Sequence, residues 1–162
     1  MNPDFQNQAQ SILESLGKTL GLDGLTFENA ASTCLLVLDG KMEIAVTLNE
    51  ENNELIVHHQ VGTLPESNRY DIVEQLLEAN LFWSGTRGAT LSIERTSGIV
   101  IIAKALGLHG HDGVLLTGEA LGTAIINLAD VADHWAQLLG GSAATSPDPT
   151  GQSDPSTAHL MA

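Results

Sequence analysis

The chain has 162 residues, of which 43% are hydrophobic, so it is about one domain long and can bury a core without disulfides or metals. Six Lys and Arg stand against 20 Asp and Glu, for a formal net charge of −14. Nucleic-acid binding depends on cationic side chains that displace counterions from phosphates, so this charge argues against it, and likewise against docking on anionic membranes. A basic or neutral protein partner suits the surface.

Cysteine content and hydropathy indicate a cytoplasmic protein. Cys34 is the only cysteine, so neither an intramolecular disulfide nor a cysteine-based metal site is expected. The first ten residues, MNPDFQNQAQ, lack the basic start and the apolar stretch of a signal peptide. No apolar run approaches the roughly 20 residues that cross a bilayer.

The first predicted element is an amphipathic helix over residues 3–20. Asn2 suits the N-cap, Pro3 the first helical position, and Gly21 the end. Apolar residues recur at three- and four-residue spacings, which places them on one stripe. They are Phe5, Ala9, Ile12, Leu13, Leu16 and Leu20.

An antiparallel meander is predicted next, with strands at 25–28, 33–38, 41–48 and 54–61. Asp39-Gly40 favours a two-residue type I′ turn, which would pair Leu38 with Lys41. In that register one face carries Leu35, Val37, Met42, Ile44 and Val46. The other face carries Cys34, Leu36, Leu38 and Ala45.

The second half predicts a helix over 66–80, a hairpin of strands 89–94 and 99–106, and a helix over 117–139. The apolar stripe of the middle helix is Tyr70, Val73, Leu76 and Leu77, and Trp135 in the last helix is expected in the core. The fold class is therefore α+β: an antiparallel twisted sheet with three helices, in the order helix, three or four strands, helix, two or three strands, helix. Residues 1–139 form this single domain, and the Gly-, Ser- and Pro-rich residues 140–162 are predicted to be a disordered tail.

No arrangement of residues argues for an enzyme. Phosphate-binding glycine loops and GxSxG are absent from the sequence. His58 and His59 are neighbours in a strand and so point to opposite faces. His109 and His111 lack a clear third ligand, so a plain surface loop is the preferred interpretation. We predict no catalysis, no metal and no cofactor.

Three sequence blocks resemble one family. Residues 76–83 (LLEANLFW), followed by 88–93 (GATLSI), look like the central signature of class I type III secretion chaperones, the Tir-chaperone (CesT-like) family. Residues 96–102 (TSGIVII) resemble the family's penultimate hairpin, and 127–135 (NLADVADHW) its final helix. The resemblance covers about residues 3–139. The chain departs from the family in a longer loop at 109–118 and in its tail.

The resemblance implies a homodimer that holds the N-terminal chaperone-binding segment of a secreted effector extended and secretion-competent in the bacterial cytosol. It implies no nucleotide, metal or other cofactor. It also points to the middle helix and the strand after it as the dimer interface. The candidates there are Leu77, Leu81, Trp83, Leu91 and Ile93, with ordinary core as the alternative for each.

A partner segment can be held by strand addition at a free sheet edge and by apolar side chains set into shallow pockets. If helices cover only one face of the meander, Leu36 and Leu38 would be exposed and available for a partner. Leu16, Leu20 and Phe27 are further candidates. The alternative is that both faces are covered.

Two other functions compete with the chaperone. Some proteins of this fold regulate secretion genes by exchanging between a secreted inhibitor and an anti-activator. A small-molecule-binding domain belongs to a different class and would need a deep pocket with convergent polar groups.

Overall fold

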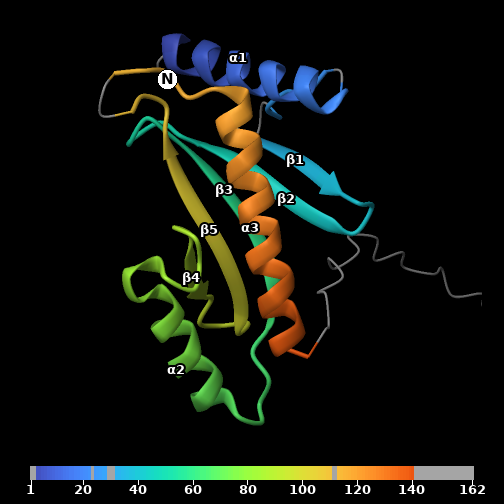
Figure 1. Cartoon of the computed structure of the whole chain (residues 1–162), viewed down its shortest axis with the longest axis vertical. Coiled ribbons are helices and arrows are strands. Elements are labelled where there is room, and N and C mark those ends of the chain that lie inside the picture. Colours follow the sequence, from blue (N-terminus) through green and yellow to red (C-terminus); the bar gives the residue numbers. More distant parts are fainter. Residues whose placement is uncertain (1–2, 23, 29–31, 111–112, 141–162) are drawn as a thin grey trace, which may run out of the picture.

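The computed structural model describes residues 3–22, 24–28, 32–110 and 113–140 (Figure 1). Within them the order is α1 (Pro3–Leu20), β1 (Thr33–Leu38), β2 (Met42–Asn49), β3 (Glu54–Thr63), α2 (Arg69–Asn80), η1 (Leu81–Trp83), β4 (Thr90–Ile93), β5 (Ile99–Gly107) and α3 (Gly118–Leu138). The short 3-10 turn η1 follows α2 directly. This order confirms the predicted α+β class. Apart from Gly140, the predicted tail lies outside the described residues.

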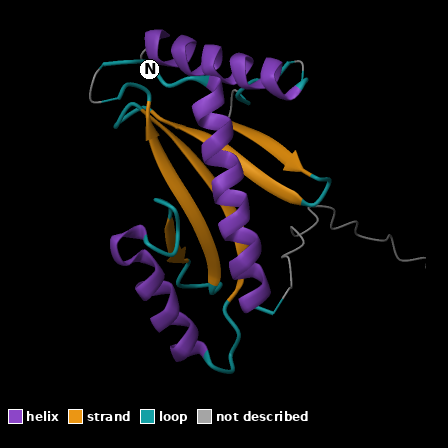
Figure 2. Cartoon of the chain, in the orientation of Figure 1, coloured by secondary structure: helices purple, strands orange, loops and turns teal. Residues whose placement is uncertain are grey.

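The five strands form one antiparallel sheet in the order β1-β2-β3-β5-β4 (Figure 2). Every second residue along the central strands is fully buried: Ile44, Val46, Leu55, Val57, Val100 and Ile102. Their neighbours on the opposite face, such as Glu43, Ile56 and Ile101, are exposed or half-buried. The helices of the described chain therefore cover only one face of the sheet.

Helix α3 packs on that covered face and runs along the strands, and α1 crosses the first turns of α3 at one end of the sheet (Figure 1). The predicted stripe of α1 is confirmed as far as Leu16, and Leu20 beyond it is exposed. The two helices meet at Gly118, where an added Cβ would lie 2.5 Å from the backbone nitrogen of Leu16. Only glycine allows this approach. Trp135 is buried in the core, as predicted.

The β1–β2 hairpin differs from the prediction by one residue. Asp39 and Gly40 have φ values of 51° and 67°, and the Lys41 N–H donates to the Leu38 carbonyl over 3.0 Å, so the predicted turn is present. Lys41, however, is an extra residue between this turn and β2, in the manner of a bulge. The observed pairs are Leu38 with Met42, Leu36 with Ile44, and Leu35 with Ala45. The predicted register is wrong, and a shift of one residue moves every side chain of a strand to the other face.

Two other predicted elements need correction. Residues 25–28 form no strand, because Glu28 makes only a single bridge to Thr33. Helix α2 begins at Arg69 rather than at 66, since Asn68 has a left-handed backbone with φ of 58°. The predicted stripe of α2 is also wrong in part: Ile72 and Leu76 are buried, whereas Tyr70 and Leu77 are exposed.

The turn between β4 and β5 is held by one carboxylate. Glu94 accepts hydrogen bonds from the backbone N–H groups of Thr96 over 2.9 Å and Ser97 over 2.6 Å. The hydroxyl of Ser97 and these backbone donors lower the pKa of Glu94 to about 2. The charged form of Glu94 therefore stabilises the folded chain.

Replacing Glu94 with Gln should lower stability in a pH-dependent way. The pKa of Glu94 is lowered in the folded chain, so its contribution is present above the ordinary value of 4.5 and is lost as pH falls from there toward about 2. We expect the variant to unfold at a lower temperature than the parent at pH 6, and the difference to vanish near pH 2. Thermal unfolding followed by circular dichroism at a series of pH values measures this. Glu66→Gln, at another exposed position, is the control, and a difference independent of pH would contradict the role assigned to the Glu94 charge.

Candidate functional site

Strand β1 is an open edge of the sheet. The Thr33 carbonyl accepts from the Glu28 N–H over 2.9 Å, away from β2, whereas the Ser32 carbonyl accepts from the Leu48 N–H over 2.9 Å. Backbone groups alternate in direction along an antiparallel strand, so those of Leu35 and Val37 point outward, as those of Thr33 do. No further strand pairs with β1 among the described residues. The outward groups of Leu35 and Val37 are therefore free to bond another chain.

The same two residues expose apolar side chains. Leu35 and Val37 are each 58% exposed, on the sheet face that the helices leave open. We call these two residues, with their outward backbone groups, the β1 edge surface. Proteins normally protect edge strands with charges, prolines or bulges, because a flat apolar edge invites pairing with another chain. An unprotected edge of this kind is suited to binding an extended peptide.

The opposite edge of the sheet is closed by a side chain. The Asn80 amide nitrogen donates to the Leu91 carbonyl of β4 over 2.9 Å, and the Leu91 N–H donates to the Asn80 amide oxygen over 2.9 Å. A side-chain amide thus satisfies the outward main-chain groups of Leu91 as a neighbouring strand would, and α2 packs on the same strand. Of the two edges, β1 is therefore the one available for strand addition.

The residues predicted to contact a partner fall into two groups. Leu16 and Leu36 are buried in the core, so the exposure expected for Leu36 is wrong, as a direct result of the register shift. Leu38 is half-buried and packs against the same core. Leu20 is 46% exposed. Phe27 is half-buried and lines a hollow of about 240 Å³ beside α1, together with Gln6, Asn7, Gln10, Glu28, Ser32 and Leu48.

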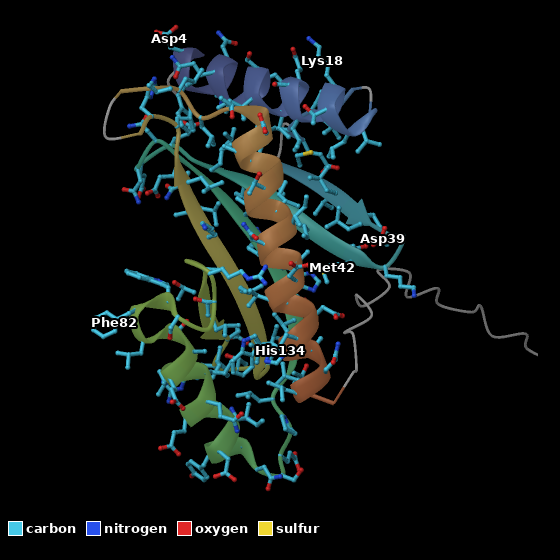
Figure 3. The ribbon with its side chains drawn as sticks, in the orientation of Figure 1. Asp4, Lys18, Asp39, Met42, Phe82 and His134 are labelled. Atoms are coloured by element: carbon cyan, nitrogen blue, oxygen red, sulfur yellow. The ribbon has the colours of Figure 1, made fainter. Side chains whose placement is uncertain are left out.

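A second apolar surface lies on α2 and η1. Its members are large, close in sequence and all more than half exposed: Tyr70, Leu77, Leu81, Phe82 and Trp83. We call this set the α2–η1 surface. Phe82 is 86% exposed, and Figure 3 shows it at the outside of the molecule, pointing away from the sheet.

The backbone of η1 is strained. Phe82 and Trp83 both have φ of 54°, in the left-handed region that bulky side chains rarely adopt, at a cost of about 1–3 kcal/mol each. Strain of this kind persists where the surrounding structure demands it, often at binding sites. Here it accompanies two aromatic side chains held outside the core.

The predicted dimer-interface residues are divided by their burial. Leu77, Leu81 and Trp83 belong to the α2–η1 surface, which is consistent with an interface but does not test it. Leu91 is 5% exposed and belongs to the core, and Ile93 is half-buried on the same short strand. Sequence reasoning missed Tyr70 and Phe82, because Tyr70 fits the helical stripe and the outward turn of η1 leaves no sequence pattern.

The polar groups of the described residues form no evident reactive site. No cluster of three or more His, Cys, Asp or Glu in that part of the chain could hold a metal ion, and His111 lies outside it. The His58 ring bonds Thr47 over 3.1 Å, and burial, then the neighbouring His59, lowers the pKa of His58. Burial, then the charge of Glu28, raises the pKa of the Cys34 thiol, which disfavours the nucleophilic thiolate.

Among the described helices, none combines the length and apolar character needed to cross a bilayer.

Comparison with known proteins places these surfaces in context. The sequence profile of the Tir chaperone protein (CesT) family matches residues 11–136. The fold is similar to that in the HopA1–SchA chaperone–effector complex, with TM-score 0.67 and 13% identity over 85% of this chain and 98% of that one. It is also similar to the ExsC–ExsE complex, with TM-score 0.66 and 21% identity over 86% and 97% of the chains. A third similar fold is that in the ExoU–SpcU complex of the Pseudomonas aeruginosa type III secretion system. Its TM-score is 0.62 and its sequence identity 21%, over 81% of this chain and 99% of that one. The sequence matches no curated protein.

Proposed function

This chain belongs to the Tir chaperone protein (CesT) family, whose profile spans residues 11–136, and from that premise we propose that it is a type III secretion chaperone. It binds the N-terminal chaperone-binding segment of a secreted effector in the bacterial cytoplasm and keeps that segment extended and secretion-competent. It acts as a homodimer, uses no cofactor and catalyses no reaction.

The open β1 edge is the observation that carries this proposal. An extended segment added beside β1 bonds the outward groups of Leu35 and Val37, and its side chains meet those two apolar residues. An extended, unfolded segment offers both its main chain and its side chains to such an edge. The net charge of −14 favours a segment that is basic or neutral.

The α2–η1 surface supports the homodimer. Exposed Trp, Phe and Tyr are common interface anchors, and a cluster of them on adjacent elements is unusual in a monomer. Helix α2 packs on β4, at the sheet edge opposite β1. Figure 1 shows α2 and β1 at opposite sides of the molecule. A dimer formed through this surface leaves the β1 edge of both subunits open to clients.

Affinity purification of the tagged chain from its native bacterium tests the proposal. We expect one dominant co-purifying protein, captured through its N-terminal region and missing from the secreted fraction when this gene is deleted. A transcription-control protein in its place would favour the regulatory alternative. A dimer that came out alone under secretion-inducing conditions, or with only a bound metabolite, would contradict the chaperone function.

A further inference from the structure

A cavity of about 570 Å³ lies between the β1–β2 hairpin and the C-terminal half of α3. Leu38, Met42 and Ala129 contribute its apolar lining, and the charged residues around them are Asp39, Lys41, Arg87, Asp130 and Asp133. Figure 3 shows Met42 beside α3 and Asp39 at the tip of the hairpin. The cavity thus joins an apolar floor to a rim of opposite charges.

The charges of the rim are unequally paired. Arg87 Nη1 lies 2.9 Å from Asp130 Oδ2 and 3.4 Å from Asn127 Oδ1, and the Arg87 carbonyl accepts from Lys104 Nζ over 3.1 Å. Asp130 is therefore already neutralised by a cation that is itself held in place. Among the described residues, Asp133 accepts only the neutral Gln137 amide, over 2.9 Å.

Two carboxylates of the rim have no ion-pair partner among the described residues. Asp39 at the hairpin tip makes no ion pair within the part of the chain that the structure describes. Lys41 and Arg87 line the cavity and Lys104 lies beside Arg87, but among the described residues no cation forms an ion pair with Asp39 or Asp133. A cationic side chain placed near Asp133 and Asp39 would complete the pairing.

The cavity lies at the end of β1 on the helix-covered side of the sheet, whereas the Leu35 and Val37 side chains lie on the open face. Strand β1 ends at Leu38, which lines the cavity. A six-residue strand is about 20 Å long at about 3.3 Å per residue, so a segment added along β1 reaches the cavity with the residues just beyond its paired part. This holds for either direction of the added strand.

We propose that this cavity is a second recognition site for the client segment, which inserts one apolar side chain on the Leu38–Met42–Ala129 floor and sets an adjacent Lys or Arg against Asp133 and Asp39. The inference rests on the proposed function, since it takes strand addition at β1 as given. It adds a sequence requirement: an apolar–basic pair next to a stretch that pairs as a strand.

The test uses two synthetic peptides and the full-length protein. One peptide has an alternating Thr-Val core of six residues with Leu and Lys at both ends, so that strand direction does not matter, and the other has Glu in place of Lys. Fluorescence anisotropy gives the dissociation constant of each. The acidic surface favours the Lys peptide wherever it binds. The quantity to compare is therefore the preference for Lys, the ratio of the two dissociation constants. It is measured in a cavity variant, Asp39→Asn/Asp133→Asn, and in a charge-matched control, Glu51→Gln/Glu66→Gln. We expect this ratio to fall about tenfold in the cavity variant, relative to the parent protein, and to stay unchanged in the control.

A second pair of variants probes the floor. Ala129→Arg fills the cavity and should weaken the Lys peptide about tenfold, whereas Ala120→Arg, the same change at an exposed position of α3, should not. The inference would be overturned if the two acidic double variants changed the preference for Lys equally, or if the two Arg variants weakened the Lys peptide equally. A switch from dimer to monomer caused by Ala129→Arg alone would also overturn it.

The outcomes separate this inference from the function on which it rests. If the cavity variant and its control keep the same preference for Lys over Glu while Val37→Pro releases both peptides, strand addition stands and only the cavity site fails. If neither peptide binds the parent protein, strand addition at β1 fails together with the cavity site.

Discussion

Replacing Leu77 with Asp and Trp83 with Ala should convert the proposed homodimer into a folded monomer. Both side chains are exposed in the single chain, so the substitutions leave its core intact. Truncation of an interface Trp typically costs about 2 kcal/mol or more, and an unpaired buried charge costs about 3 kcal/mol. Together they should raise the dimer dissociation constant by roughly 10³-fold or more. Light scattering coupled to size-exclusion chromatography over a range of protein concentrations measures the change.

The matched control is Ile126→Asp, which places the same charge on another exposed apolar residue, in α3. It should remain a dimer, and circular dichroism should show parental helix content in both variants. A clean dimer of the Leu77/Trp83 double variant would remove these residues from the interface. A charge at Leu91 would be a poor test, because that side chain belongs to the core and its loss unfolds the chain.

Val37→Pro should abolish capture of the client while the chain stays folded and dimeric. The Val37 N–H points away from β2, so its loss breaks no bond of the sheet, and proline is tolerated at such edge positions. The proline ring removes one donor for an added strand and blocks its approach. We expect client affinity to fall at least about 100-fold, or about 3 kcal/mol. The readout is the amount of client recovered with the tagged chain, followed by a dissociation constant for its N-terminal segment.

Val37→Thr provides the matched control, because it keeps the N–H and the β-branched shape but loses apolar surface. It should retain most of the binding. Equal losses in Pro and Thr would assign recognition to the side chain rather than to the main chain. Undiminished binding by Val37→Pro would show that clients do not add to β1.

The sequence by itself determined the helices, most of the strands and the family. The stripe of α1 recurs with helical spacing, and Thr117 caps α3 by accepting from the Ala120 N–H over 3.1 Å. These signals are local, because a helix satisfies its main chain within a few residues. The blocks at 76–83, 96–102 and 127–135 are also local, and together they indicated the family that the profile match shows.

Only the tertiary structure decided which side chains of β1 face the solvent. Residues 34–38 are apolar without interruption, so the strand has no alternation to select a face, and its register depends on pairing with β2. The extra residue Lys41 sets that pairing, which buries Leu36 and exposes Leu35 and Val37.

The closed β4 edge and the cavity beside α3 have the same origin. Asn80 reaches Leu91 across 11 positions of the chain, and Arg87 reaches Asp130 across 43. Contacts between residues so far apart depend on how the whole sheet and its helices pack. No pattern within a single strand or helix records them, and so the candidate binding surfaces emerged only from the folded chain.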